Sequence, residues 1–498
     1  MNAVRRWVLR AGVVVAIGCL VLVAVSAQDH STSLAYAPIL DRDQVVAWVD
    51  AWNQQLPYVP GELLVKFKPG SEPAQQQAAL SALRGGTSAM SAQWIGDVLR
   101  LRTPNEPNPE IAAAVLARQP EVQWAQPNYL VRSSAVPNDT LYNLQWNFDA
   151  INLPAAWDIN PGSSAAVTVA VIDSGVTETN LTQGFPLWTG TQIQTFNIPF
   201  VQNPDIATSR FTKGRDFIFW NGPVLDMEGH GTHVAGTALE ETNNALALAG
   251  IAYKAHLMPL KACVGYWELQ ILQSASGISG RVDPRSGTLC GTTTVTSAIR
   301  YAADNGAQII NMSLGGPDPS PAFLDALQYA VQHGVFVAIA AGNHFEEGNT
   351  TEYPAAYAPQ IDGVMAVAAV NRSLQHAFYS NTGSYVEVAA PGGDERDGGL
   401  SGFIYQVAPN PPDFDPFTVT VPRFDRYANV AEQGTSMAAP HVAGVAALLY
   451  SQGIKNPAAI EAALKQFAKD LGPPGRDDQF GYGLIDARAA VRGLGIAR

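Results

Sequence analysis

Apolar and polar positions along this chain follow two different patterns, which divide it into two folded regions. In the first region, short stretches alternate apolar and polar residues as half-buried strands do, with helical stretches between them. The strands are predicted at 61–67, 98–101 and 122–125, and the helices at 74–83 and 111–116. Strands and helices that alternate over so short a length predict a small α+β domain at residues 57–132, with one face of its sheet covered.

The second region contains continuous apolar runs, rich in β-branched residues, that alternate with amphipathic helical stretches. Such runs are typical of parallel strands that are buried on both faces. The strands are predicted at 166–172, 255–259, 308–312, 335–340 and 363–370, and the helices at 232–240, 295–305 and 323–333. This order predicts an α/β domain at residues 141–495, a doubly wound and mostly parallel sheet with helices on both faces. Ligands of such sheets bind at the carboxyl ends of the strands.

The N-terminus has the pattern of a secretory signal peptide at residues 1–27. Arginines precede an apolar run at residues 11–25, and small residues follow it where a signal peptidase cuts. Because the run is marginally short for a membrane span, an uncleaved anchor that holds the protein at the cell envelope is the alternative. Residues 28–56 are predicted to form a linker with one helix-like patch, and residues 133–140 a processing junction. We therefore expect a secreted protein.

Composition narrows the range of partners and compartments. The chain has 498 residues and a formal net charge of −13, which argues against nucleic acid as the main partner because phosphate binding needs a basic surface. Only Cys263 and Cys290 follow the signal peptide. In an exported protein two cysteines indicate a disulfide, which would contribute about 3.5 kcal/mol by the chain-entropy estimate. Two free buried thiols are the alternative.

Three polar side chains of the second domain lie where a strand ends or a helix begins. Asp173 ends the first central strand, His230 begins a helix, and Ser436 lies in the turn before an apolar helix. Each alone has a simpler interpretation, such as a turn-forming aspartate or a helix-capping serine. Together they meet the needs of nucleophilic catalysis: a base for the serine proton, a carboxylate that orients the base, and a helix N-terminus that favours developing negative charge.

Asn343 adds a fourth group just after the predicted strand at 335–340. A side-chain amide at a strand end is well placed to donate a hydrogen bond to the oxyanion that forms when the serine attacks. A zinc site is not favoured here, because His230 and His233 are three residues apart rather than four and no glutamate lies between them. His233 and His441 are predicted to be packed structural histidines.

The segments around these residues carry a resemblance to a known family. They are Val-Ile-Asp-Ser-Gly at Asp173, Gly-His-Gly-Thr-His-Val-Ala-Gly at His230, and Gly-Thr-Ser-Met-Ala-Ala-Pro-His-Val-Ala-Gly at Ser436. They resemble the three signature motifs of the subtilisin-like serine peptidases (the subtilase family), and the order Asp, His, Ser is that of subtilisin. The resemblance covers about residues 139–489. It implies a serine endopeptidase that works through an acyl-enzyme, with Asn343 as the oxyanion residue and no cofactor for catalysis.

The same resemblance implies a propeptide and a substrate cleft. The region from Pro60, with its Pro-Gly-Glu-Leu-Leu-Val-Lys-Phe opening, is similar to propeptides of the fervidolysin and thermitase-like group, which act as intramolecular chaperone and inhibitor. We therefore expect a monomeric zymogen whose partners are its own propeptide and protein or peptide substrates. The implied substrate-binding residues are Ser313, Leu314, Gly315, Gly316, Ala341 and Gly342. Glu352 precedes Tyr353-Pro354, where the family's pocket floor lies, and its carboxylate would favour a basic residue before the cut bond.

A structural calcium ion is implied by two segments that resemble the calcium-binding segments of thermitase-like members. The ligands would be oxygen atoms of mixed type, which suit calcium. They are the side chains of Asp139 and Asn244 and the carbonyls of Glu241, Leu246 and Leu248. The family's aspartate in a His-Pro-Asp-Leu setting is not found, and Asn180 is its nearest equivalent.

Two stretches are insertions relative to the family, at about 266–287 and 394–431. They are predicted near the cleft rim, where they either narrow substrate access or form neutral surface loops. A narrow processing enzyme with one target is therefore one alternative function. A secreted scaffold that keeps the fold without cutting is another, although it would have no reason to keep all four catalytic groups.

Overall fold

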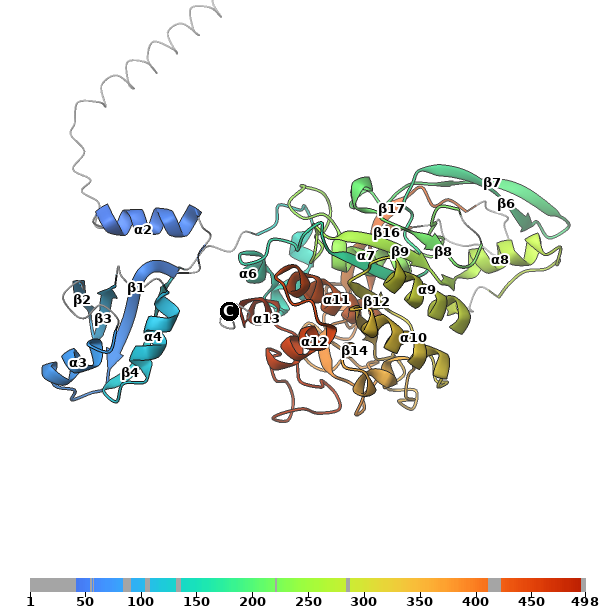
Figure 1. Cartoon of the computed structure of the whole chain (residues 1–498). Coiled ribbons are helices and arrows are strands. Elements are labelled where there is room, and N and C mark those ends of the chain that lie inside the picture. Colours follow the sequence, from blue (N-terminus) through green and yellow to red (C-terminus); the bar gives the residue numbers. More distant parts are fainter. Residues whose placement is uncertain are drawn as a thin grey trace, which may run out of the picture. The chain divides into compact units, whose positions relative to one another are not determined.

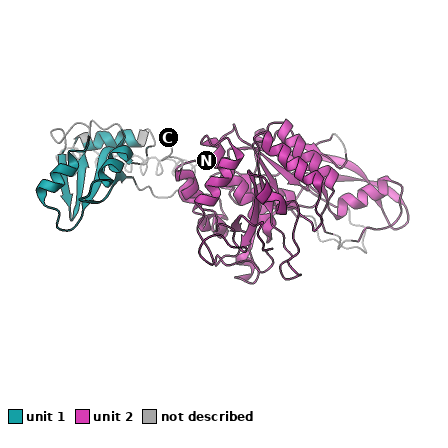
Figure 2. Cartoon of the chain, turned by 60° about the horizontal axis from the view of Figure 1, so that its bottom comes forward, with its two compact units in different colours: residues 1–133 teal, residues 134–498 magenta. Residues whose placement is uncertain are grey.

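The structure, a computed structural model, divides the chain into two compact units at residues 1–133 and 134–498 (Figure 2). It describes residues 42–53, 56, 58–83, 91–103, 108–130, 136–219, 222–283, 287–410 and 422–493. The predicted signal peptide at 1–27 and part of the junction at 133–140 lie outside the described residues. The unit boundary falls within that junction, and the exact domain limits stay predictions. None of the helices in the described ranges has both the length and the apolar character needed to span a bilayer.

In its described residues, unit 1 has a four-stranded antiparallel sheet and three helices (Figure 1). The strands are β1 (Tyr58–Phe67), β2 (Ser91–Ile95), β3 (Val98–Arg102) and β4 (Val122–Tyr129), in the order β2-β3-β1-β4, and the helices are α2 (Arg42–Asn53), α3 (Pro73–Leu80) and α4 (Pro109–Ala117). Its apolar core includes Leu63, Val65, Leu101 and Leu116. Strand β2 was not predicted, because every side chain in it is exposed and it shows no apolar alternation.

Unit 2 is built on a seven-stranded sheet in which every neighbouring pair is parallel, which confirms the predicted fold class. The order is β15-β14-β13-β12-β5-β9-β8. The strands are β5 (Thr168–Asp173), β8 (Arg215–Asp216), β9 (His256–Lys261), β12 (Ile309–Met312), β13 (Phe336–Ala340), β14 (Val364–Val370) and β15 (Val388–Pro391). The central strands are buried throughout, which explains their continuous apolar runs.

Two pairs of helices cover this sheet (Figure 1): α7 packs against α11 on one face, and α9 packs against α10 on the other. The helices are α7 (His230–Leu239), α9 (Thr292–Asp304), α10 (Pro321–Gln332) and α11 (Thr435–Ser451), followed by α12 (Pro457–Gln466) and α13 (Ala487–Gly493). Helix α11 is apolar on all sides because it is buried against β12 to β15 as well as α7. The contact between α7 and α11 brings together the helices that begin with the histidine and the serine motifs.

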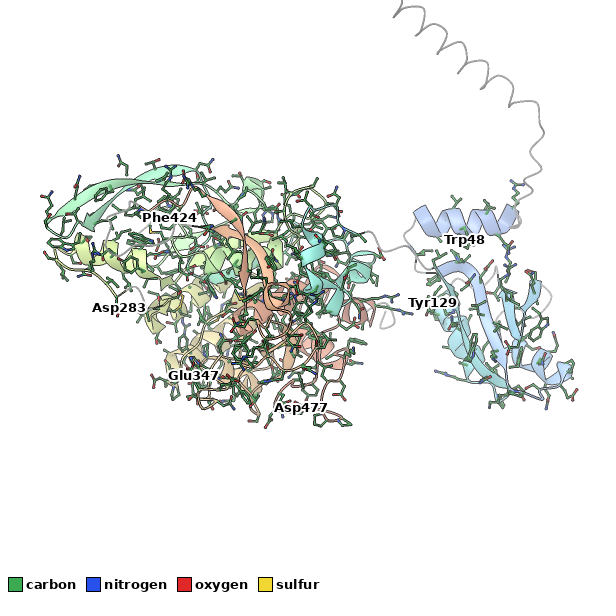
Figure 3. The ribbon with its side chains drawn as sticks, turned by 180° about the vertical axis from the view of Figure 1, so that it is seen from behind. Trp48, Tyr129, Asp283, Glu347, Phe424 and Asp477 are labelled. Atoms are coloured by element: carbon green, nitrogen blue, oxygen red, sulfur yellow. A yellow bond between two sulfur atoms is a disulfide. The ribbon has the colours of Figure 1, made fainter. Side chains whose placement is uncertain are left out.

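Both predicted insertions have ordered structure and pack near a hairpin that was not predicted. The hairpin is β6 (Leu181–Trp188) with β7 (Ile193–Phe200), the first insertion contains α8 (Tyr266–Ala275), and the second contains parts of β16 (Ile404–Pro409) and β17 (Tyr427–Glu432). Residues 411–421 of the second insertion lie outside the described residues. A small separate core joins these parts: Ile271 from α8 and Phe424, labelled in Figure 3, meet Phe200 of the hairpin. The rings of Phe200 and Phe424 stack with centroids 5.2 Å apart.

The first insertion is closed at its base by a disulfide. The sulfur atoms of Cys263 and Cys290 are 2.09 Å apart, and the two residues face each other in the short antiparallel pair of β10 (Cys263–Val264) and β11 (Leu289–Cys290). The bridge joins the segment after β9 to the segment before α9. It therefore ties the insertion to the sheet beside the strand that carries Asp173.

Candidate active site

Asp173 and His230 form a hydrogen-bonded pair at the carboxyl end of the sheet. Asp173 is the last residue of β5 and His230 is the first residue of α7. The distance from His230 Nδ1 to Asp173 Oδ1 is 2.8 Å, and the backbone N–H of Ser174 donates to the same oxygen at 2.7 Å. The carboxylate is 2% exposed, so its contact with the imidazole is weakly screened by water. This geometry suits a carboxylate that fixes the orientation and tautomer of a catalytic base.

A second carboxylate holds the start of α7 in place. Asp226 Oδ1 accepts hydrogen bonds from the backbone N–H groups of Glu228 and Gly229, at 3.0 and 2.9 Å, and from the Ser174 hydroxyl. Gly231 follows the histidine and needs to be glycine, because a Cβ there would lie 2.3 Å from the carbonyl oxygen of Gly175. This close approach explains the glycine that follows the histidine in the motif.

Ser436 is the second residue of α11 and lies beside the segment that follows β12. Its backbone carbonyl accepts a hydrogen bond from the Ser313 hydroxyl at 2.7 Å, and its own hydroxyl donates to the Ser313 carbonyl at 3.4 Å. Within the described ranges, no hydrogen bond joins Ser436 to His230. Nucleophile–base hydrogen bonds are often long without substrate and tighten when it binds, so the packing of α7 on α11 remains compatible with a catalytic pair.

The amide of Asn343 is oriented by the residue before the serine. Its Oδ1 accepts two hydrogen bonds from Thr435, from the backbone N–H at 2.8 Å and from the hydroxyl at 2.9 Å. The amide nitrogen is thus left to donate toward the turn that carries Ser436, and a Cβ at Gly434 would lie 3.4 Å from it. Sequence reasoning found Asn343 but missed Thr435, although this threonine stands inside the Gly-Thr-Ser-Met motif.

The charge environment of His230 contains two further carboxylates that sequence reasoning missed. Burial alone lowers the pKa of His230, but the charge and hydrogen bond of Asp173, followed by the charges of Glu228 and Glu432, outweigh burial and raise this pKa. The side chain of His230 is 22% exposed, so water screens part of this attraction. Burial raises the pKa of Glu228 itself to about 7. Its Oε2 accepts from the backbone N–H of His230 at 2.8 Å, and its Oε1 from the Thr288 hydroxyl at 2.9 Å.

Glu432 gives a test of this electrostatic arrangement. A general base works when it is neutral, so a raised pKa of His230 places the acidic limb of kcat/KM at a higher pH. We expect Glu432→Gln to move that limb to lower pH by about 0.3–0.7 units, since one partly screened negative charge is removed. The pH profile of the matured enzyme measures it, with Glu347→Gln as the control on an exposed loop. An acidic limb that stays in place in Glu432→Gln would contradict the assignment.

The ring nitrogens of His233 and His441 contact groups other than the candidate catalytic residues. The Nδ1 of His441 contacts the carbonyl of Met437 at 2.8 Å and its Nε2 contacts the side chain of Asn147 at 2.8 Å. Burial lowers the pKa of His441 to about 4, so the ring is neutral near neutral pH. His233 Nε2 lies 3.2 Å from the carbonyls of Ile404 and Val430, and burial also lowers its pKa. Both are therefore packed structural histidines.

The two predicted substrate-binding segments lie next to each other at the carboxyl ends of adjacent strands β12 and β13. Gly316 pairs in antiparallel fashion with Tyr353, with backbone hydrogen bonds of 2.9 and 2.7 Å. The backbone N–H of Gly342 donates to the Thr435 hydroxyl at 3.1 Å, which connects the second segment to the serine turn. Glu352 is 3% exposed and lies between the two segments.

The predicted calcium ligands gather around Asp139, with one exception. Asp139 accepts from the backbone N–H groups of Asn243 and Asn244, at 2.9 and 3.4 Å, and the Asn244 amide donates to Asp205 at 2.6 Å. Asn180 does not join them, since its Oδ1 accepts instead from the backbone N–H of Gln202 at 2.7 Å. The carboxylate that contacts Asn244 is Asp205, which was not predicted. Its signal was Asn-Pro-Asp-Ile at 203–206, which differs from the expected His-Pro-Asp-Leu at its first and last residues.

Asp205 carries the observation that supports a cation here. Its Oδ2 is buried and has no hydrogen-bond partner among the described residues. Burial, and less strongly the charges of Asp139 and Glu241, raise the pKa of Asp205 to about 6. Within the described ranges no group of three or more His, Cys, Asp or Glu side chains has an arrangement that could hold a metal ion, so carbonyl and amide oxygens would have to complete the ligand set. The leucine carbonyls differ in availability, because Leu246 O already accepts from Thr140 N at 3.0 Å.

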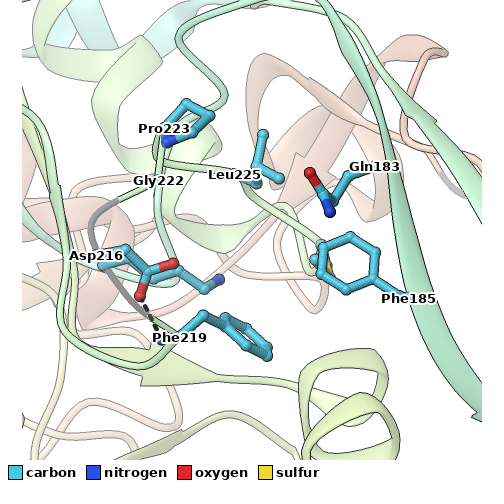
Figure 4. A pocket seen from close by; sticks show the side chains of 9 residues that line it. Gln183, Phe185, Asp216, Phe219, Gly222, Pro223 and Leu225 are labelled. Atoms are coloured by element: carbon cyan, nitrogen blue, oxygen red, sulfur yellow. Dashed lines mark hydrogen bonds between the residues drawn. The ribbon is translucent and has the colours of Figure 1, made fainter. Parts of the chain in front are cut away.

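Unit 2 also contains a separate pocket (Figure 4). It is lined by Gln183, Phe185, Asp216, Phe219, Gly222, Pro223, Leu225, Met227 and Lys261. The ammonium of Lys261 is already bonded to the Ser174 carbonyl and to Glu268, at 2.5 and 2.8 Å. Asp216 accepts from the backbone N–H groups of Ile218 and Phe219. Its charged groups are therefore satisfied within the fold, and the lining includes none of the four candidate catalytic residues.

Comparison with known proteins matches each of the two units to a protein family. Residues 164–483 match the subtilase family, and residues 49–128 match the fervidolysin N-terminal prodomain. A thermophilic serine proteinase from Bacillus sp. (strain AK1) is 32% identical, over 91% of this chain and 92% of that protein. Thermitase from Thermoactinomyces vulgaris is 33% identical, over 72% of this chain and 99% of thermitase. The crystal structure of fervidolysin from Fervidobacterium pennivorans has the same fold, with a TM-score of 0.53 at 23% identity over 88% of this chain and 61% of that one.

Proposed function

Because this chain belongs to the subtilase family of serine peptidases, we propose that it is a secreted endopeptidase that is made as a self-inhibited zymogen. The proposed catalytic activity is supported by the fixed orientation of two groups, the imidazole of His230 and the amide of Asn343. Asp173 orients His230 through a 2.8 Å contact, and Thr435 holds the Asn343 amide through two hydrogen bonds to its oxygen. A non-catalytic scaffold would need neither arrangement.

In the proposed reaction, the hydroxyl of Ser436 attacks the carbonyl carbon of a peptide bond while His230 accepts its proton. Asp173 stabilises the imidazolium, and the amide of Asn343 and the backbone N–H of Ser436 donate to the tetrahedral oxyanion. His230 then gives the proton to the leaving amine, which departs and leaves an acyl-enzyme. Water, activated by His230, hydrolyses this ester and regenerates the serine.

Unit 1 is the proposed intramolecular inhibitor, since its residues 49–128 match a prodomain family. Cleavage is expected within the junction at 133–140, where the chain passes from one unit to the other. Export is supported by the signal-like N-terminus, by the disulfide between Cys263 and Cys290, and by similar proteins that are named extracellular proteases. The matured enzyme is expected to be a monomer.

Cleavage assays test the proposed activity and separate it from the narrower alternatives. Matured protein should degrade denatured casein, and the Ser436→Ala protein should not. Cleavage of one neighbouring protein without activity on casein would instead favour a processing enzyme with a single target. Failure of wild type to cut either substrate after maturation would favour the non-catalytic scaffold.

Calcium is the proposed structural ion at Asp139, Asp205 and Asn244, where its charge would offset the two carboxylates. In the Ser436→Ala background, which prevents self-digestion, saturating calcium should raise the melting temperature by about 3–5 °C. Asp205→Asn should remove most of this increase, because it removes the negative charge and the unpartnered oxygen Oδ2 that would bind the ion. Asn180→Ala is the control and should keep the full response. An equal calcium response in Asp205→Asn and its parent would rule out this site.

A further inference from the structure

Glu352 lies where the two substrate-binding segments face each other. The pairing of Gly316 with Tyr353 brings the preceding residue, Glu352, up to the backbone of the first segment. A Cβ at Gly315 would lie 2.9 Å from Glu352 Oε2, and a Cβ at Gly342 would lie 2.3 Å from Glu352 Cγ. Both neighbours therefore have to be glycine for the carboxylate to lie between them. The first segment reaches Ser436 directly through the Ser313 hydroxyl.

The two oxygens of Glu352 have different environments. Oε1 accepts a hydrogen bond from Nδ1 of His344 at 2.7 Å. Oε2 accepts no hydrogen bond from any described residue, and it is not fully shielded from solvent. Oε2 therefore reaches solvent between two glycine backbones, although only 4% of the Glu352 side chain is exposed.

The charge of Glu352 is only weakly compensated. Its ionic partner within the described ranges is His344, whose side chain is 52% exposed and therefore well solvated. Arg396 is paired with a different carboxylate of the loop that carries His344, since it forms two hydrogen bonds with Glu346, at 2.6 and 2.7 Å. A nearly buried carboxylate is stabilised strongly by a cation that reaches it where water is displaced. The oxygen open to such a cation is Oε2, because Oε1 already accepts from His344.

We propose that Glu352 Oε2 selects a lysine or arginine side chain immediately before the peptide bond that is cut. The substrate backbone lies along the two glycine-containing segments. The side chain of the residue before the cut bond then points between these segments, and the cationic end of that side chain meets Oε2. His344 holds the other oxygen and fixes the orientation of the carboxylate. An acidic substrate side chain meets a like charge in a poorly screened site and is excluded. This specificity rests on the proposed peptidase function.

Peptide p-nitroanilides that differ only in the residue before the cut bond provide the measurement. With matured protein at pH 8, kcat/KM for Lys and Arg should exceed that for Leu by about 10–100-fold, and Glu should be the poorest residue. In Glu352→Gln the ratio of Lys to Leu should fall at least tenfold. This ratio is independent of the fraction of active molecules, because the same molecules cut both substrates, so partial misfolding does not obscure the result.

Glu347→Gln is the matched control. Glu347, labelled in Figure 3, is an exposed carboxylate on the loop that carries His344, and its loss should change the ratio less than twofold. A Lys to Leu ratio that is the same in wild type and Glu352→Gln would overturn the proposal and leave Glu352 as a structural partner of His344. If the enzyme is active but shows no preference for basic residues, only the proposed specificity is wrong. If it is inactive on every substrate, the proposed peptidase function is wrong.

Discussion

The Ser436→Ala protein is expected to keep its full mass on storage, while the wild-type proprotein shortens itself to a product that begins near the unit boundary at Ser133. The reason is that only the serine hydroxyl can form the acyl-enzyme, and loss of the equivalent serine in subtilisin lowers kcat by about 10⁶-fold. Intact mass measured over time on the two purified proproteins decides the matter. The new N-terminus of the product locates the maturation site.

The same experiment has two outcomes that would contradict the proposal. Shortening of both proteins at the same rate would mean that another protease, or another nucleophile, cuts the junction. If neither shortens, an external protease is added to remove unit 1, and activity on casein is measured again. Inactive wild type after that removal would favour the non-catalytic scaffold.

Replacement of Asn343 by alanine should lower kcat by about 10²–10³-fold with little change in KM, because its amide donates to the oxyanion, which exists only after the serine attacks. Steady-state kinetics on one good peptide substrate separate the two constants. The contacts with Thr435 show why the effect is specific, since they hold the amide in one orientation. The variant should be matured with external protease, because its own processing will be slow.

Asn456→Ala is a suitable control for this experiment. Asn456 caps α12 by accepting from the backbone N–H groups of Ala458 and Ala459, so its loss should cost about 1 kcal/mol of stability and leave kcat near the wild-type value. An Asn343→Ala enzyme with unchanged kcat, or with a raised KM alone, would mean that the amide contacts bound substrate rather than the transition state.

The parallel sheet could be predicted because its strands are buried on both faces. Residues 335–340 and 363–370 are apolar throughout, and β13 and β14 are buried at every position. Some of the strands that were missed are exposed wholly or in part, whereas the four-residue strand β15 was missed although every residue in it is buried. Strand β2 is exposed along its length, and the β6–β7 hairpin packs only against a small separate core, so neither has the burial that produces a clear pattern.

The reactive groups could be found because each lies inside a short contiguous motif. The motif chemistry around Asp173, His230 and Ser436 depends on neighbours within a few residues, such as the glycines that allow α7 to begin against β5. Asp205 shows the limit of such matching. Its motif differed at two of four positions, and only its contact with Asn244 placed it beside Asp139.

What the local motifs could not show is the electrostatic setting of these groups, because it comes from segments far apart in the chain. Glu432 acts on His230 from the end of β17, and Thr288 reaches Glu228 from the base of the disulfide-closed insertion. Oε2 of Glu352 is left facing solvent by the close approach of two glycine backbones, which no local pattern predicts. Coulomb energies and desolvation depend on distance in space, whereas a motif records neighbours along the chain. The sequence thus indicated the fold and the reacting groups, and the tertiary structure decided the charges and the space around them.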